Sequence, residues 1–224
     1  MAGWYNFTIL ITEESCIYIE GITDKSLTGR DRNGGLIMKN MTICVYGAAS
    51  DRIAPVFVTE TEKLGTEIAR RHHRIIYGGG ASGVMGACAR GAAREGGTVI
   101  GVVPEFMDEF EVINDNCTDI IRTKTMSQRK DTMEDRADAF IIAPGGIGTF
   151  DEFFQILTLT ELGQKVAPIV IYNIDGYYDD LIAFMRKCTE KGFIRPRVMT
   201  LFRVCSTAAE AVNAVEEMKR LENA

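Results

Sequence analysis

Histidine and paired cysteines are scarce in this chain of 224 residues. Its two histidines, His72 and His73, are adjacent, so a metal site would need other ligands, and we predict no bound metal. The six cysteines are scattered, include no C-x-x-C pair and lie partly in apolar segments. This pattern favours reduced cytosolic thiols over a disulfide framework or a zinc site.

Long apolar runs and an excess of basic charge are also absent. No apolar stretch reaches the roughly 18–20 residues needed to span a bilayer, and the N-terminus lacks the pattern of a signal peptide. The net charge of −6 argues against a nucleic-acid partner, which would need a basic patch. We therefore expect a cytoplasmic protein that binds neither membrane nor nucleic acid.

The first 40 residues differ in character from the rest of the chain. The stretch "FTILITEESCIYIEGIT" is hairpin-like in composition, and "TGRDRNGGLIMKN" is polar and rich in turn residues. We expect residues 1–40 to be an N-terminal extension outside the core fold. Residues 41–224 should form a single domain.

From residue 42 onward, short apolar strands alternate with helical patterns. This alternation predicts an α/β fold, a Rossmann-like doubly wound parallel sheet in a three-layer α/β/α sandwich. The connection from Glu105 to Thr125 is long, and long connections are often functional. The expected strands are 42–47, 74–80, 98–104, 138–144, 168–173 and 198–205, and the expected helices are 55–71, 83–95, 126–136, 149–162, 177–191 and 207–222.

Ligands of such folds bind at the carboxyl ends of the strands, where this sequence has two glycine-rich corners. In "YGGGASG", Gly78, Gly80 and Gly83 match the G-x-G-x-x-G dinucleotide fingerprint, and Glu105 follows where a ribose-binding acid could lie. The motif follows the second expected strand, however, whereas the fingerprint normally follows the first. The glycines could equally serve only tight turning and close helix–strand packing.

The second corner, "APGGIGTFDE", predicts an anion site. Gly145, Gly146 and Gly148 let the backbone turn its N–H groups inward, and Thr149 offers a helix N-cap and a hydroxyl donor. The positive end of the helix dipole points to the same place. A Walker loop is excluded because G-K-S/T is missing, so a monophosphate is the simplest ligand.

Charged pairs accompany this corner. Asp151 and Glu152 lie in the first turn of the expected helix, where they could simply complement its dipole. Arg129 and Lys130, in "MSQRK", open the helix that precedes the "DAFIIAP" strand. They could bind phosphate, hold a carboxylate in place or be ordinary surface charges.

The motifs "YGGGASGVMG", "MSQRK" and "PGGIGTFDE", in this order, resemble the signatures of the LOG family, the cytokinin riboside 5′-monophosphate phosphoribohydrolases. The resemblance extends from about Met41 to Phe193. It implies a Rossmann-like homodimer without a cofactor. Such an enzyme hydrolyses the N-glycosidic bond of a nucleoside 5′-monophosphate, AMP or a cytokinin-type nucleotide, to free base and ribose 5-phosphate.

The resemblance also implies roles for individual residues. Arg129 and Glu152 match the family's catalytic residues. Ile147 stands where an aromatic residue is common, and "FDE" replaces the usual "LEE", which bears on the preferred base more than on the reaction. The predicted substrate-binding residues are Gly79, Gly80, Glu111, Met126, Lys130, Gly145, Gly146, Ile147, Gly148, Thr149, Phe150 and Asp151.

Breaking a ribosyl C–N bond builds positive charge on the sugar, which a nearby carboxylate stabilises. We assign this role to Glu152, with Arg129 orienting it and the glycine corner holding the 5′-phosphate. Two other functions stay open. One is a non-catalytic nucleotide or cofactor carrier of the same superfamily, and the other is an NAD-dependent oxidoreductase, which rests on one glycine motif and one acid.

Overall fold

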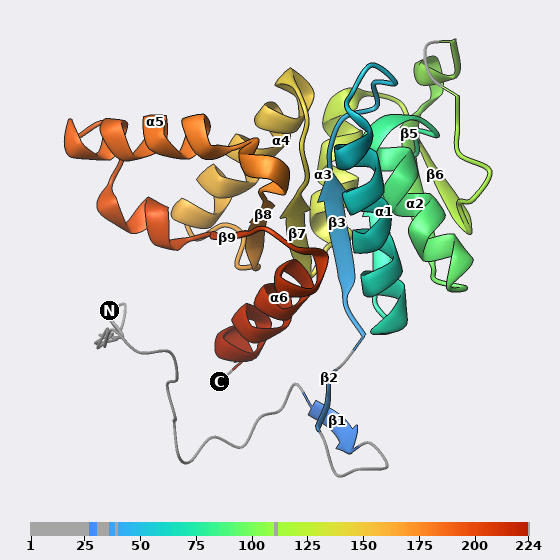
Figure 1. Ribbon diagram of the computed structural model, residues 1–224, viewed down its shortest axis with the longest axis horizontal. Helices are drawn as coiled ribbons and strands as arrows, with labels where there is room; N and C mark the ends of the chain where they lie inside the picture. The colour runs from blue at the N-terminus through green and yellow to red at the C-terminus, as the bar shows by residue number, and fades with distance from the viewer. Residues whose placement is uncertain (1–26, 31–35, 39, 110–111, 224) are drawn as a thin grey trace.

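A seven-stranded sheet forms the middle layer of the computed structural model, which describes residues 27–30, 36–38, 40–109 and 112–223 (Figure 1). Its strand order is β6-β5-β4-β3-β7-β8-β9, and every pairing is parallel. The predicted Rossmann-like α/β sandwich is confirmed. The strands are β3 Thr42–Tyr46, β4 Arg74–Tyr77, β5 Val99–Pro104, β6 Asp119–Thr123, β7 Ala139–Ile142, β8 Ile169–Tyr172 and β9 Arg203–Cys205.

Helices cover both faces of the sheet because side chains alternate along each strand. On β3, Ile43 and Val45 join the core beneath α1, α2 and α6, whereas Cys44 and Tyr46 join the core beneath α3, α4 and α5. The helices are α1 Pro55–Arg70, α2 Gly83–Arg94, α3 Met126–Arg136, α4 Ile147–Glu161, α5 Asp179–Glu190 and α6 Ala208–Asn223.

The strand order reverses direction between β3 and β7. From β3 the chain builds outward to β6 on one side, then crosses to β7 and builds outward to β9 on the other. The loops after β3 and β7 meet there, where the Ala48 amide donates to the Pro144 carbonyl at 3.0 Å. Open α/β sheets bind their ligands outside such a switch point.

The long connection from Glu105 to Thr125 is not a simple loop. It begins with a 3₁₀ helix, η1 (Glu105–Glu109), and ends with the edge strand β6, which the sequence did not predict. Four of the five β6 residues are exposed or half-buried. Without a continuous apolar run, this strand gives no buried-strand signal.

The predicted strand 198–205 was also wrong in extent. A 3₁₀ helix, η3, occupies Pro196–Thr200, and only Arg203–Cys205 pairs with β8 as strand β9. Pro196 begins η3, as expected of a residue whose fixed φ suits a first helical turn. The apolar residues of this stretch therefore pack in a helical turn before the strand.

In the N-terminal region, β1 (Leu27–Arg30) and β2 (Leu36–Met38) form a separate antiparallel pair. The hairpin-like stretch at 7–23 lies outside the described residues. The division into an extension at 1–40 and a domain at 41–224 therefore remains a prediction.

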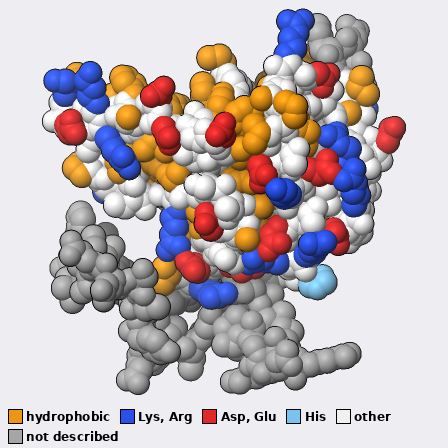
Figure 2. Space-filling view, in the orientation of Figure 1, with side chains coloured by type: hydrophobic (Ala, Val, Ile, Leu, Met, Phe, Trp, Pro, Cys, Tyr) orange, Lys and Arg blue, Asp and Glu red, His pale blue; other side chains and the backbone are white. Residues whose placement is uncertain are grey.

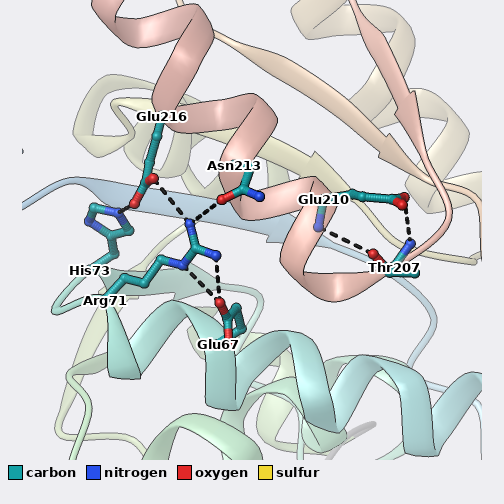
Figure 3. Close-up of polar contacts among 7 residues, drawn as sticks. All are labelled: Glu67, Arg71, His73, Thr207, Glu210, Asn213 and Glu216. Atoms are coloured by element: carbon teal, nitrogen blue, oxygen red, sulfur yellow. Dashed lines mark hydrogen bonds and ion pairs between the residues drawn. The ribbon is translucent and has the colours of Figure 1, made fainter.

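An ion-pair network joins helix α6 to the C-terminal end of helix α1 (Figure 3). Arg71, just after α1, donates to Glu67 at 2.6 Å and to Glu216 of α6 at 3.1 Å. The buried ring of His73 accepts a hydrogen bond from the Met41 amide at Nδ1. Nε2 must then carry the hydrogen, and it donates to Glu216 at 3.1 Å. His73 thus has a structural role.

Other surface properties are ordinary. Lysine and arginine side chains are interspersed with aspartate and glutamate on the described part of the face shown in Figure 2, without a broad basic patch. No helix among the described residues is long and apolar enough to cross a membrane. Those residues also contain no group of three or more potential metal ligands, and their five cysteines are free.

Candidate active site

The second glycine corner begins helix α4 earlier than expected. Gly146 is the N-cap, and its carbonyl accepts the amide of Phe150 at 3.0 Å, so the prediction of Thr149 as N-cap was wrong. Thr149 lies instead in the first turn, buried, with its hydroxyl against Gly145. A Cβ on Gly145 would lie 2.0 Å from that oxygen, so this glycine makes room for the threonine.

The outer side of this corner is open. A Cβ on Gly146 or Gly148 would meet no atom within 4 Å, and Ile147 between them is 83% exposed. The first N–H groups of a helix have no partner within it, and they carry the positive end of its dipole. An open helix start of this kind is compatible with the predicted anion site, which remains a prediction.

Two consecutive residues of α3 pair with two consecutive residues of α4. Arg129 Nη1 lies 3.1 Å from Glu152 Oε1, and both side chains are about nine-tenths buried. Lys130 Nζ lies 2.9 Å from Asp151 Oδ2, and that aspartate is 60% exposed. The structure thus brings all four predicted charges together, as a buried Arg129–Glu152 pair and an outer Lys130–Asp151 pair.

The buried pair has unusual electrostatics. Burial raises the pKa of Glu152 from its ordinary 4.5 to about 7, and the guanidinium of Arg129 limits the rise. A carboxyl with such a pKa changes protonation near neutral pH. Its charge has little competition from water, which makes it effective in stabilising a neighbouring cation.

The first glycine corner holds Arg129 in place. The guanidinium lies against Gly78, where a Cβ would be 2.0 Å from Nη2. Arg129 Nε also donates to the Val102 carbonyl at 3.2 Å. Glycine at position 78 therefore leaves the space that the guanidinium occupies, which the sequence pattern did not reveal.

The same corner does not match a dinucleotide site. The amide of Met85, in the first turn of α2, donates to the Ala48 carbonyl at 3.1 Å. Gly83 has φ +61°, and its Cα packs against the carbonyls of the loop after β3. Protein backbone therefore occupies this helix start, and Glu105 is exposed. These contacts support packing over an NAD fingerprint.

The remaining predicted residues lie beyond the carboxyl ends of the strands, around the two glycine corners. Gly79 and Gly80 pair with the segment after η1, through the Asn114 amide and a bridge to Ile113. Met126 starts α3 and is 42% exposed, and Phe150 is half-buried. Glu111 lies outside the described residues, so its role remains a prediction.

Two tyrosines were missed as site residues. Tyr177 and Tyr178 donate from their hydroxyls to the carbonyls of Gly145 and Ala143, at 2.7 and 2.8 Å. The stretch "NIDGYYDDLIAFM" contributed to the family resemblance, but only the folded chain shows which backbone these hydroxyls reach.

The fold and the site define a Rossmann-like α/β protein with an anion corner and a buried arginine–glutamate pair at its switch point. A family model described as "Possible lysine decarboxylase" matches residues 85–215. The probable cytokinin riboside 5′-monophosphate phosphoribohydrolase LOGL9 of Oryza sativa subsp. japonica is 33% identical over 195 residues, covering 87% of this chain and 86% of that protein. The cytokinin riboside 5′-monophosphate phosphoribohydrolase LOG7 of Arabidopsis thaliana is 34% identical over 175 residues, covering 78% and 81%. The chain belongs to the LOG family, which confirms the resemblance.

Solved structures show the same fold. The molybdenum cofactor carrier protein of Chlamydomonas reinhardtii matches with a TM-score of 0.64 at 24% identity, covering 80% of this chain and 98% of that one. The molybdenum cofactor binding protein of Rippkaea orientalis matches with a TM-score of 0.63 at 21% identity, covering 81% and 98%. At these identities the likeness concerns the fold alone.

Proposed function

We propose that this protein hydrolyses the N-glycosidic bond of a nucleoside 5′-monophosphate, AMP or a cytokinin-type nucleotide, releasing free base and ribose 5-phosphate. The observation that carries this proposal is the buried Arg129–Glu152 pair beside the open start of α4. The names of the relatives, all phosphoribohydrolases of cytokinin nucleotides, support the same reaction.

Different groups of the site act on the two ends of the substrate, the phosphate and the ribose. The backbone amides at the start of α4 hold the 5′-phosphate. Glu152 lies about one helical turn further along, where its carboxylate stabilises the positive charge that develops on the ribose. Arg129 orients that carboxylate and lowers its pKa from the higher value that burial alone would give, because the ion pair favours the ionised form.

The chemical step is a hydrolysis. The C–N bond breaks and its electron pair leaves with the base, while a water oxygen forms a new bond to C1′. One proton of that water is lost, and the departing base gains one. Binding energy from the phosphate can be used to position the sugar for this step. Glu111 is proposed as a second carboxylate near the sugar.

Incubation of the purified protein with AMP, with free adenine as the readout, tests the proposal. The Glu152→Gln variant should lose about 10³-fold in turnover, because it removes the charge from the reacting centre. Glu134→Gln is the matched control, since Glu134 is another buried carboxyl at the α3–α4 contact but bonds to Gln155. An unchanged rate in Glu152→Gln would contradict the assignment.

A substrate panel distinguishes the enzyme from a carrier. Purine monophosphates and cytokinin nucleotides should differ in rate, which identifies the preferred base. Binding without base release from any of them would instead favour the non-catalytic carrier. The two structural relatives are named a molybdenum cofactor carrier protein and a molybdenum cofactor binding protein.

We also propose that the protein acts as a cytoplasmic homodimer. Light scattering during size-exclusion chromatography measures the oligomeric state, and a monomer at working concentrations would contradict that part.

A further inference from the structure

The loop that leads into α4 has all four of its carbonyl oxygens occupied by donors from the protein. A backbone carbonyl carries a partial negative charge, so one that faced the anion corner would repel a phosphate. The donors come from a loop, from a helix and from two side chains. The Ala143 oxygen accepts from the Tyr178 hydroxyl, that of Pro144 from the Ala48 amide, that of Gly145 from the Tyr177 hydroxyl and that of Gly146 from the Phe150 amide.

The two tyrosine bonds differ from the other two because they come from outside the switch point. They are made by consecutive residues that precede α5, and they reach carbonyls two residues apart. Both carbonyls therefore face the tyrosines, with the bend at Pro144 between them. Holding both of them toward the tyrosines keeps that side of the backbone turned away from the ligand.

The tyrosines are themselves rigidly held. The Tyr178 amide donates to Asn173 Oδ1 at 2.7 Å, and Asn173 Nδ2 donates to Asp179 Oδ1 at 2.7 Å. The rings of Tyr177 and Tyr178 pack edge to face at 4.9 Å, and Phe57 of α1 packs against Tyr177. Burial raises the pKa of Tyr178, so its hydroxyl keeps the proton that it donates.

We propose that Tyr177 and Tyr178 are positioning residues for the phosphate end of the site, holding the carbonyls of Gly145 and Ala143 away from the bound anion. This inference rests on the proposed function, because it takes the ligand of the corner to be a 5′-phosphate. The tyrosines act through the backbone of the loop and need not touch the substrate.

Phenylalanine variants test the role with little change in packing. Tyr178→Phe should weaken binding of AMP and of ribose 5-phosphate by about 5–10-fold, the value of one lost hydrogen bond. Tyr177→Phe should have a smaller effect because Tyr177 is 42% exposed. Binding of adenosine, which lacks the phosphate, should change less than twofold, and kcat for AMP should fall far less than KM rises.

Tyr172→Phe is the matched control. Its hydroxyl also donates to a backbone carbonyl, that of Glu60 at 3.3 Å, but in the core on the opposite face of the sheet. This variant should lose comparable thermal stability and bind all three ligands like the wild type. Titration calorimetry measures the affinities, and circular dichroism measures Tm.

The outcomes separate this inference from the proposed function. Wild-type protein that binds ribose 5-phosphate but releases no base overturns the function, while a selective loss in Tyr178→Phe still supports the positioning role. Equal losses for AMP and adenosine, or unchanged affinity in the folded double variant Y177F/Y178F, overturn the inference. Wild-type protein that binds neither AMP nor ribose 5-phosphate overturns it as well.

Discussion

The two glycine-rich corners of this sheet look alike in sequence but differ in what surrounds them. After β4, Gly78 lies against the Arg129 guanidinium, and Gly83 lies against backbone carbonyls. After β7, Gly146 and Gly148 face open space at the start of α4. The first corner therefore packs the protein together, whereas the second has open space beside the first turn of a helix.

The difference shows what a glycine motif can mean. A glycine is needed where another part of the molecule approaches its Cα, and that part can be protein or ligand. The first corner makes room for the guanidinium of Arg129, which is assigned to catalysis only in the proposed function. The second corner is where the anion binds in the proposed function.

Substitution within the first corner should have the largest effect on folding. Gly83→Ala places a methyl group 2.6 Å from the Ala48 carbonyl oxygen at φ +61°, so the free energy of unfolding should fall by about 3 kcal/mol or more. Gly96→Ala is the control, with a similar φ of +68° but no atom within 4 Å, and should cost about 1 kcal/mol. Urea unfolding measures both, and equal losses would show that the close approach is unimportant.

Substitution in the second corner should separate binding from folding. Gly148→Ala adds a methyl group to the first turn of α4, where alanine favours the helix, so stability should hold or rise by up to about 1 kcal/mol. The same methyl group would crowd the amides that face the phosphate, and KM for AMP should rise about tenfold. Steady-state kinetics measure KM and a thermal melt measures stability. An unchanged KM would contradict the prediction.

A change outside both corners provides a baseline. Arg71→Met removes the bonds to Glu67 and Glu216, and the free energy of unfolding should fall by about 1 kcal/mol with no change in KM or kcat. The highly exposed Arg195, 3.6 Å from Glu161, is the control and should cost nothing measurable as Arg195→Met. Altered kinetics in Arg71→Met would mean that the α1–α6 contact is coupled to the site.

The smallest expected effects are shifts in pH dependence. If ionised Glu152 is required, kcat/KM should rise with pH around a midpoint near 7, the pKa of that carboxyl. Lys130→Met should raise the midpoint and Asp151→Asn should lower it, because the lysine favours the charge and the aspartate opposes it. A midpoint that stays fixed in both variants would assign it to another group.

The same carboxyl affects stability in the opposite direction. Because the folded protein raises the pKa of Glu152, folding favours the protonated form, and this contribution is fully present below about pH 4.5. It is lost as the pH rises through about 7. Glu152→Gln should therefore be less sensitive to pH across this window in urea unfolding.

Much of the fold was predictable because the buried strands are short apolar runs between helical patterns. The strands β3, β4, β5, β7 and β8 were predicted in this way, and so were all six helices. Strand β6 was missed because its residues are mostly exposed at the sheet edge. Local pattern carries no information about a strand whose stability comes from pairing with its neighbour.

The site was predictable to the extent that its residues are close in sequence. Glu152 follows the open glycines by about one helical turn, and Arg129 was assigned by family resemblance. The contacts of Arg129 with Gly78, and of Tyr178 with Ala143, join distant segments. Only the parallel sheet brings these segments together, so no local sequence pattern predicts these contacts.

The hydrogen bond between Ala48 and Pro144 has a consequence for the order in which the molecule is made. Strands β3 to β6 leave the ribosome first and can pair with one another, but the wall of the anion corner after β7 does not yet exist. A ligand can recognise only the finished sheet. Ligand binding therefore stabilises the completed protein by mass action, and it does not stabilise the partly synthesised chain.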